Sequence, residues 1–408
     1  MCINFNTEGI NIYFLCPFAC FFFLVLSSYA SNESEFYKNP FVQNIIVSFG
    51  EMLAIIPHLI SIFIDNKIYK KNTQSVQKSA KSNRKKLGFE YEYNNSEDDI
   101  PKITVYQMLY LGFIDCLQSL CFFYGNYYTQ YQFYFWSSHI FFLCLFTKYL
   151  LFKRLYIHHV ISFVIFIILD VLHIIIVIMD SNNYLFDNII FVFLLISNIC
   201  LSFELVYERR LMDYNYVSIY KLCFLVGIFT FFINLIISLI MTIIAHHLTN
   251  KPDFIFDYSD YFDSISGNVG REIYKIILYM FLTGLYNIFQ FLTIKHLTPN
   301  HALITQIMLA FYCSVINIFY IEIDYSTYLL TVACHSMCIL VLLFFLEIIE
   351  LKCCGMDYET AHNIIKRSEL DYDMRTFTTS TAGDVEDNGD LSRNSTISER
   401  SESIESIQ

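Results

Sequence analysis

The chain has 408 residues, of which 55% are hydrophobic and only 16% are charged, and its mean hydropathy is +0.46. Soluble domains carry about 25% charged residues, so these values exclude an ordinary soluble protein and indicate one that lies in a lipid bilayer. The net charge of −12 gives no electrostatic reason to expect nucleic acid as a partner.

The apolar residues fall in long blocks, which is the pattern of membrane-spanning helices. The predicted spans are 12–30, 41–64, 103–125, 133–150, 157–179, 187–208, 219–245, 273–294, 302–321 and 325–347. The predicted fold class is therefore an all-α polytopic membrane protein with ten transmembrane helices.

The first span has a second interpretation. It ends in Ser28-Tyr29-Ala30, a small-x-small pattern like that of a signal-peptidase site. However, the residues before it contain no Lys or Arg, which a signal peptide would need at this place. We expect an uncleaved helix, while cleavage would leave nine spans and the same orientation for the rest.

The positive charges predict the orientation, because Lys and Arg collect in cytoplasmic loops. If the N-terminus is cytoplasmic, ten spans place all but four of the 26 Lys and Arg residues on the cytoplasmic side. The exceptions are Lys38, Lys251, Arg271 and Lys275. A wrong number of spans would scramble this distribution, so we predict that both termini are cytoplasmic.

Two segments with little apolar content are predicted to be disordered and cytoplasmic. The loop 65–102 is first basic and then acidic, and the tail 355–408 is acidic and rich in Ser and Thr.

Two tight links between spans indicate an internal repeat. Lys153 and Arg154 lie between the fourth and fifth spans, and Glu322 and Asp324 lie between the ninth and tenth. Five spans per repeat would invert the second copy, which would put the basic link inside and the acidic link outside. The predicted five-helix repeats are 1–179 and 187–350.

Polar residues inside the predicted spans need polar partners or water. The candidates for a substrate cavity or a coupling site are Glu51, Asp115, Gln118, Asn126, Trp136, Asn198, Glu204, Asn287, Gln290 and Gln306. Their number favours a polar cavity at the centre of the bundle. For each residue taken singly, a helix–helix hydrogen bond is the alternative.

Glu51 lies near the middle of the second span, where a carboxylate facing lipid would be costly. We expect it to face the bundle, with Asp115, Gln118 or Asn287 as its partner. Two roles are open. Glu51 is either a proton-coupling carboxylate in a cavity or a structural hydrogen-bonding group, and the adjacent Gly50 favours the second role because it suggests close packing at this level.

No hydrolase, nucleotide-binding or zinc-protease motif is present in the sequence. Asp170 and His173 lie at i, i+3 but have no third metal ligand at a recognisable spacing. The pairs His158-His159 and His246-His247 lie at helix ends and are expected to face lipid headgroups. We therefore predict no enzyme activity, no cofactor and no metal site.

The second span begins with NPFVQNIIVSFGE, which contains Pro40, Phe41, Gln43, Phe49, Gly50 and Glu51. Further segments are IDCLQSL with Asp115, and Asn126 near the end of the same span; LSFELVYERRL with Glu208, followed by Gly227; and YNIFQFLTIKHLT with Asn287, Thr293 and Lys295. In this order they resemble the solute carrier 35 family, subfamily F, member-six type, of the drug/metabolite transporter (EamA-type) superfamily. The likeness covers roughly residues 10 to 350.

The resemblance implies two inverted five-helix repeats, alternating access and a central cavity. Relatives export or exchange metabolites, often nucleotide sugars, across endomembranes, so an integral protein of Golgi or endolysosomal membranes is expected. The chain departs from the family where relatives carry Arg in the fourth helix, and Arg, Asp and Arg in the ninth. Those positions hold Ser137-Ser138, and Ala302, Gln306 and Leu309.

A polyanionic nucleotide sugar would need fixed cations at its site, so we expect a neutral or cationic solute instead. The predicted function is secondary transport of a small metabolite by alternating access, with the lipid bilayer and a small-molecule solute as partners. The alternative is a non-transporting membrane scaffold that retains the fold, which the missing Arg and Asp residues favour. A homodimer is compatible with either function.

Overall fold

The computed structural model describes residues 3–5, 13, 15–31, 39–64, 104–128, 138–152, 155–180, 188–215, 217–247, 269–320 and 325–351. The loop 65–102, the tail 355–408 and the candidate residue Trp136 lie outside the described residues.

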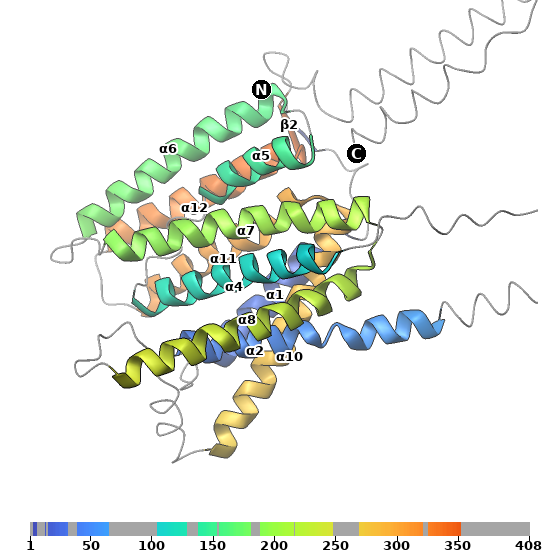
Figure 1. Ribbon diagram of the computed structural model, residues 1–408. Coiled ribbons are helices and arrows are strands. Elements are labelled where there is room, and N and C mark those ends of the chain that lie inside the picture. The colour runs from blue at the N-terminus through green and yellow to red at the C-terminus, as the bar shows by residue number, and fades with distance from the viewer. Residues whose placement is uncertain are drawn as a thin grey trace, which may run out of the picture. The chain divides into compact units, whose positions relative to one another are not determined.

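The described chain is almost entirely helical (Figure 1). Its helices are α1 (Leu15–Ser31), α2 (Pro40–Met52), α4 (Val105–Tyr128), α5 (Ser138–Leu150), α6 (Ile157–Asp180), α7 (Asn188–Tyr214), α8 (Ile219–His247), α10 (Val269–His296), α11 (Pro299–Tyr320) and α12 (Tyr325–Phe345). Two short strands, β1 (Ile3–Phe5) and β2 (Ile349–Leu351), pair antiparallel. Each predicted span overlaps one of these helices, so the all-α prediction is confirmed for the described residues.

The start and the end of α2 follow from its sequence. The side-chain oxygen of Asn39 accepts hydrogen bonds from two backbone N–H groups of the first turn, and Pro40 occupies a position where no backbone donor is needed. Pro57 lacks a backbone N–H, and its ring crowds the carbonyl four residues earlier. The helix is therefore interrupted at Leu53–Ala54 and resumes as far as Ile64. The second predicted span is thus an interrupted helix rather than a continuous one.

The helices fall into two compact units. Unit 1 comprises Met1–Ile12, Tyr134–Asn182 and Ala310–Gln408, and unit 2 comprises Tyr13–Phe133 and Asn183–Leu309. In unit 2, α1 packs against α10, α4 packs against α7 and α8, and α2 packs against α4, α8 and α10. In unit 1, α6 packs against α5 and α12.

Glycines bring the backbones of α2, α8 and α10 into close contact. A Cβ atom on Gly284 of α10 would lie 2.5 Å from the carbonyl oxygen of Gly50 in α2, and one on Gly227 of α8 would lie 2.7 Å from the Cβ of Glu51. No larger side chain fits at these positions unless the helices move apart. The prediction that Gly50 marks a close helix contact is confirmed, and Glu51 lies where three helices meet.

Helix α8 carries its polar residues inside and its apolar residues outside. Thr230, Asn234 and Ser238 are buried, whereas large apolar side chains at helical spacing are exposed. The exposed residues are Phe232, Ile236, Leu239, Ile240 and Ile243. A helix in water shows the reverse arrangement, so this face suits lipid.

Length and composition also identify helices that can cross a bilayer. By these criteria four described helices qualify, namely Pro40–Ile64, Val105–Gly125, Ile219–Ile244 and Val269–His296, and shorter apolar helices accompany them. Together with the outward apolar face of α8, they indicate an integral membrane protein.

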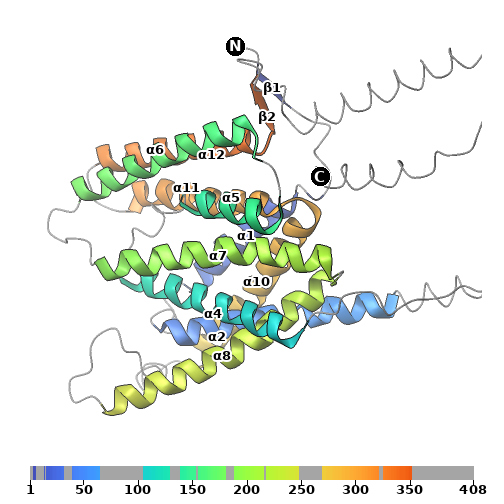
Figure 2. The same cartoon turned by 45° about the horizontal axis from the view of Figure 1, so that its top comes forward.

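Unit 1 brings the two ends of its described chain together. Ile3 pairs with Leu351 and Phe5 with Ile349 in the β1–β2 ladder (Figure 2). His158, in the first turn of α6, is buried, with 1% of its surface exposed, and lies 3.0 Å from Glu347. The expectation that this histidine faces lipid headgroups is therefore wrong, because the end of α12 packs over the start of α6.

Candidate functional site

Four acidic side chains are buried together inside unit 2. Glu51 lies on α2, Asp115 on α4, and Glu204 and Glu208 on α7. Their exposed fractions are 6%, 5%, 7% and 2% in this order. Glu51 is close enough to Asp115 and Glu208 to interact with both electrostatically, and Glu204 interacts with all three of the others. We call these four residues the carboxyl cluster.

Glu51 is held from one side only. The side-chain amide of Asn287 on α10 donates a hydrogen bond of 2.8 Å to Glu51 Oε1. Glu51 Oε2 is buried and has no hydrogen-bond partner. The prediction that Glu51 faces the bundle and meets a polar partner is confirmed, and Asn287 is that partner. The second oxygen is available to a proton, a water molecule or a ligand.

Asp115 is held by α8 and lies near a second carboxyl group. The hydroxyl of Thr230 on α8 donates a hydrogen bond of 2.5 Å to Asp115 Oδ2. Glu204 on α7 is close enough to Asp115 for the two carboxyl groups to interact electrostatically. Two ionised carboxylates repel each other, and a proton or a cation beside them relieves that repulsion. This pair is therefore suited to binding and releasing a positive charge.

Glu204 and Glu208 lie at i, i+4 and so share one face of α7. Glu208 Oε2 is buried without a hydrogen-bond partner. Glu208 is the last residue of the sixth predicted span and is not among the site residues predicted from the sequence. The i, i+4 spacing from Glu204 was the signal that could have identified it.

Within the described chain, none of the four carboxyl groups is paired with a Lys or an Arg. Arg209 follows Glu208 directly, but its guanidinium points to the C-terminal end of α10. It donates hydrogen bonds to the carbonyl oxygens of Ile294 and Lys295 and pairs with Asp213. The basic side chains near this end therefore cap a helix and do not neutralise the carboxyl cluster.

The remaining candidate residues lie at different places in unit 2. Gln306 donates to the hydroxyl of Tyr286 at 3.3 Å, and Gln118 donates to Ser197 at 3.5 Å. Asn198 is buried on α7, and Gln290 has a buried side-chain oxygen without a partner. Asn126 lies on α4, with its side chain outside the described part.

Helices α4 and α10 carry the same spacing of residues at the site. Gly112, Asp115 and Gln118 on α4 recur as Gly284, Asn287 and Gln290 on α10. In both helices the glycine lies against a neighbouring helix backbone, since a Cβ on Gly112 would meet α8 and one on Gly284 would meet α2. The middle residue then hydrogen-bonds to that same neighbour, Asp115 to α8 and Asn287 to α2.

Comparison with protein families finds no family model that matches the chain. Comparison with curated proteins likewise finds none that matches it.

Proposed function

We propose that this protein is a secondary transporter that moves a small neutral or cationic solute by alternating access. The observation that carries the proposal is the carboxyl cluster, in which four buried acids meet without a described basic partner. Ionised carboxylates at such a place are costly unless a positive charge compensates for them. A proton or a cationic solute can supply that charge, and either can leave again when the helices rearrange.

The packing of the helices supports a fold of two five-helix repeats. If the ten helices are divided after α6, then α1, α2 and α4 correspond to α7, α8 and α10. The contact of α1 with α10 then matches that of α7 with α4, and the contact of α2 with α10 matches that of α8 with α4. The α2–α4 contact likewise matches the α8–α10 contact. A pseudo-two-fold axis that relates the repeats produces this pattern.

The residues at the site follow the same symmetry. The hydrogen bond from Asn287 to Glu51 joins α10 to α2, and its counterpart from Thr230 to Asp115 joins α8 to α4. The repeated spacing of Gly112 and Asp115, and of Gly284 and Asn287, agrees with this correspondence. Sites at the interface of inverted repeats are where alternating access exposes a solute first to one side and then to the other.

Contacts between helix ends support ten crossings with both termini on one side. The β1–β2 ladder joins the segment before the first span to the segment after the last, which agrees with an even number of crossings. The ring of Tyr13, before α1, stacks on His296 at the end of α10 with centroids 3.8 Å apart. With ten crossings, the start of α1 and the end of α10 both lie on the side of the membrane that holds the N-terminus. The distribution of Lys and Arg favours the cytoplasm for this side.

The chemistry of the cluster argues for the class of solute. Acidic groups without fixed cations repel a nucleotide sugar, whose phosphates require Arg or Lys. The solute carrier 35 resemblance supports an endomembrane location, Golgi or endolysosomal, and a transport function. The competing function is that of a membrane scaffold, for which the cluster would only join helices.

The test is solute flux in liposomes that contain the purified protein. A trapped pH-sensitive dye reports proton movement when neutral and cationic metabolites are added outside, with nucleotide sugars as the anionic comparison. We expect saturable flux of a neutral or cationic solute, and its loss in Glu204→Gln, which keeps the size of the side chain but cannot ionise.

Glu272→Gln is the matched control. Glu272 is also a buried acid, but it pairs with Lys275 at 3.3 Å near the start of α10 and lies outside the cluster. Its variant should retain flux. Saturable transport of a nucleotide sugar, or absence of flux with every solute in a well-folded preparation, would count against the proposal.

A further inference from the structure

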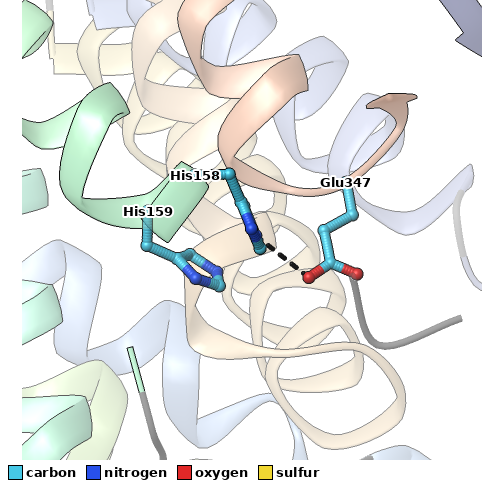
Figure 3. Close-up of side chains that lie close together, drawn as sticks. All are labelled: His158, His159 and Glu347. Atoms are coloured by element: carbon cyan, nitrogen blue, oxygen red, sulfur yellow. Dashed lines mark ion pairs between the residues drawn. The ribbon is translucent and has the colours of Figure 1, made fainter. Parts of the chain in front are cut away.

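We propose that unit 1 contains a binding site for a divalent transition-metal ion of the zinc type, formed by His158, His159 and Glu347. One ligating atom from each residue lies within 4.8 Å of the other two (Figure 3). The site is separate from the carboxyl cluster and does not depend on the proposed transport function.

The ends of two packed helices bring these residues together. His158 and His159 follow Ile157, the first residue of α6, and Glu347 follows closely after α12. Because α6 packs against α12, the start of one helix meets the end of the other. The ring centroids of the two histidines are 4.0 Å apart. In Figure 3 the His158 ring points at the Glu347 carboxylate, and the His159 ring lies on the other side of the His158 ring.

The hydrogen bonding of His158 points to a ligand. Its Nε2 atom lies 3.0 Å from Glu347 Oε1, yet both ring nitrogens are buried without a hydrogen bond of acceptable geometry. Buried polar atoms in native proteins nearly always have a partner. A metal ion between the imidazole and the carboxylate would satisfy Nε2 and the carboxylate together.

The distances fit coordination after small side-chain movements. Zinc binds histidine nitrogen and carboxylate oxygen at about 2.0–2.2 Å, which puts the ligand atoms of a tetrahedral site roughly 3.3 Å apart. Two imidazoles with one carboxylate are a known catalytic zinc set that leaves the fourth position to water. The imidazoles favour zinc and its neighbours over magnesium or calcium, which prefer oxygen ligands.

Glu347 has an unusual backbone conformation. Its φ is 59°, in the left-handed region that residues other than glycine rarely adopt. Such conformations persist where the surrounding structure holds them, and they cluster at ligand-binding positions. Here the β1–β2 ladder follows directly and fixes the chain beyond Glu347. The strained turn directs the carboxylate towards α6.

His159 is expected to be the weakest ligand. The backbone N–H of Tyr156 donates a hydrogen bond of 3.2 Å to His159 Nδ1. Coordination through Nδ1 would use the same lone pair, and coordination through Nε2 would require a proton on Nδ1, so either mode ends this hydrogen bond. Metal binding must therefore offset that loss, which gives His159 a smaller net contribution than His158.

The test is titration of the metal-free, full-length protein in detergent with Co²⁺, whose visible absorption reports tetrahedral coordination, followed by displacement with Zn²⁺. We expect one ion per chain. His158→Ala should weaken binding by more than the roughly 10–100-fold that loss of an outer-shell partner costs, and His159→Ala should weaken it less. The double variant His246→Ala/His247→Ala, which removes the other adjacent histidine pair, should bind as the unaltered protein does.

Glu347→His separates a metal site from a simple ion pair. It keeps a metal ligand at a position where histidine tolerates the left-handed conformation, but it removes the acid that a protonated His158 would need. Retained Co²⁺ absorption in Glu347→His supports the metal site. Absence of a tetrahedral Co²⁺ spectrum in the unaltered protein, or equal binding by His158→Ala, would overturn it and leave the His158–Glu347 ion pair alone.

Discussion

The contact between Gly284 and Gly50 offers the sharpest test of the packing around the carboxyl cluster. In Gly284→Ala the new Cβ would lie 2.5 Å from Gly50 O, while ordinary contact begins at 3.4 Å. Helices α2 and α10 must therefore separate by about 0.9 Å at this level, since the obstructing atom is backbone and cannot rotate away. Overpacking of this kind costs about 1–3 kcal/mol.

The alanine also improves helix propensity by up to about 1 kcal/mol, which offsets part of that cost. A control on the same helix isolates the two effects. A Cβ on Gly270 meets nothing within 4 Å, so Gly270→Ala should be neutral or slightly stabilising. We expect Gly284→Ala to be less stable than Gly270→Ala by about 1–3 kcal/mol.

Thermal unfolding of the two purified variants in the same detergent measures this difference. Flux through the Gly284→Ala protein should also fall, because the separation lengthens the Asn287–Glu51 hydrogen bond three residues further along α10. Equal unfolding temperatures for the two variants would refute the close α2–α10 contact and, with it, the placement of Glu51 beside Asn287.

Three further predictions follow from the same structure. Glu51→Gln should be as stable as the unaltered protein because its side chain still accepts a hydrogen bond from Asn287. Glu51→Ala leaves the Asn287 amide unpaired, which should lower the stability measured by thermal unfolding by about 1–3 kcal/mol. Normal expression of Glu51→Gln with loss of pH-dependent flux would make Glu51 a coupling residue, and unchanged flux would make it structural. Epitope tags in the loop 65–102 and in the tail 355–408 should both be reached by antibody after selective permeabilisation of the plasma membrane, and tags on opposite sides would contradict ten crossings. Arg209→Ala should lower the unfolding temperature by removing the cap on the last carbonyls of α10, while the neighbouring Arg210→Ala should not, because Arg210 makes no such contact in the described chain.

Much of the site was predictable as a set of residues but not as an arrangement. Glu51, Asp115, Glu204 and Asn287 are predictable because ionisable or amide side chains inside apolar spans need polar partners, and the local sequence shows this need. Asn287 was one of three expected partners of Glu51, and only the crossing of α2 and α10 at Gly50 and Gly284 selects it. Glu208 is not among the predicted site residues, and only the tertiary structure places it close to Glu51 and Glu204.

The sequence by itself determined where the helices lie. A chain in lipid must satisfy its backbone hydrogen bonds internally, so the length of an apolar run is enough to identify a membrane-spanning helix. The predicted start of the second span, residue 41, lies one residue from the start of α2 at Pro40, because the beginning of a helix depends on adjacent residues such as Asn39. The tertiary structure alone decided which side chains meet. His158 and Glu347 are brought together by the packing of α6 on α12, and the carboxyl cluster depends on backbone contacts at glycines from three helices. These contacts are between residues far apart in the chain, and no local pattern of hydropathy or charge predicts them.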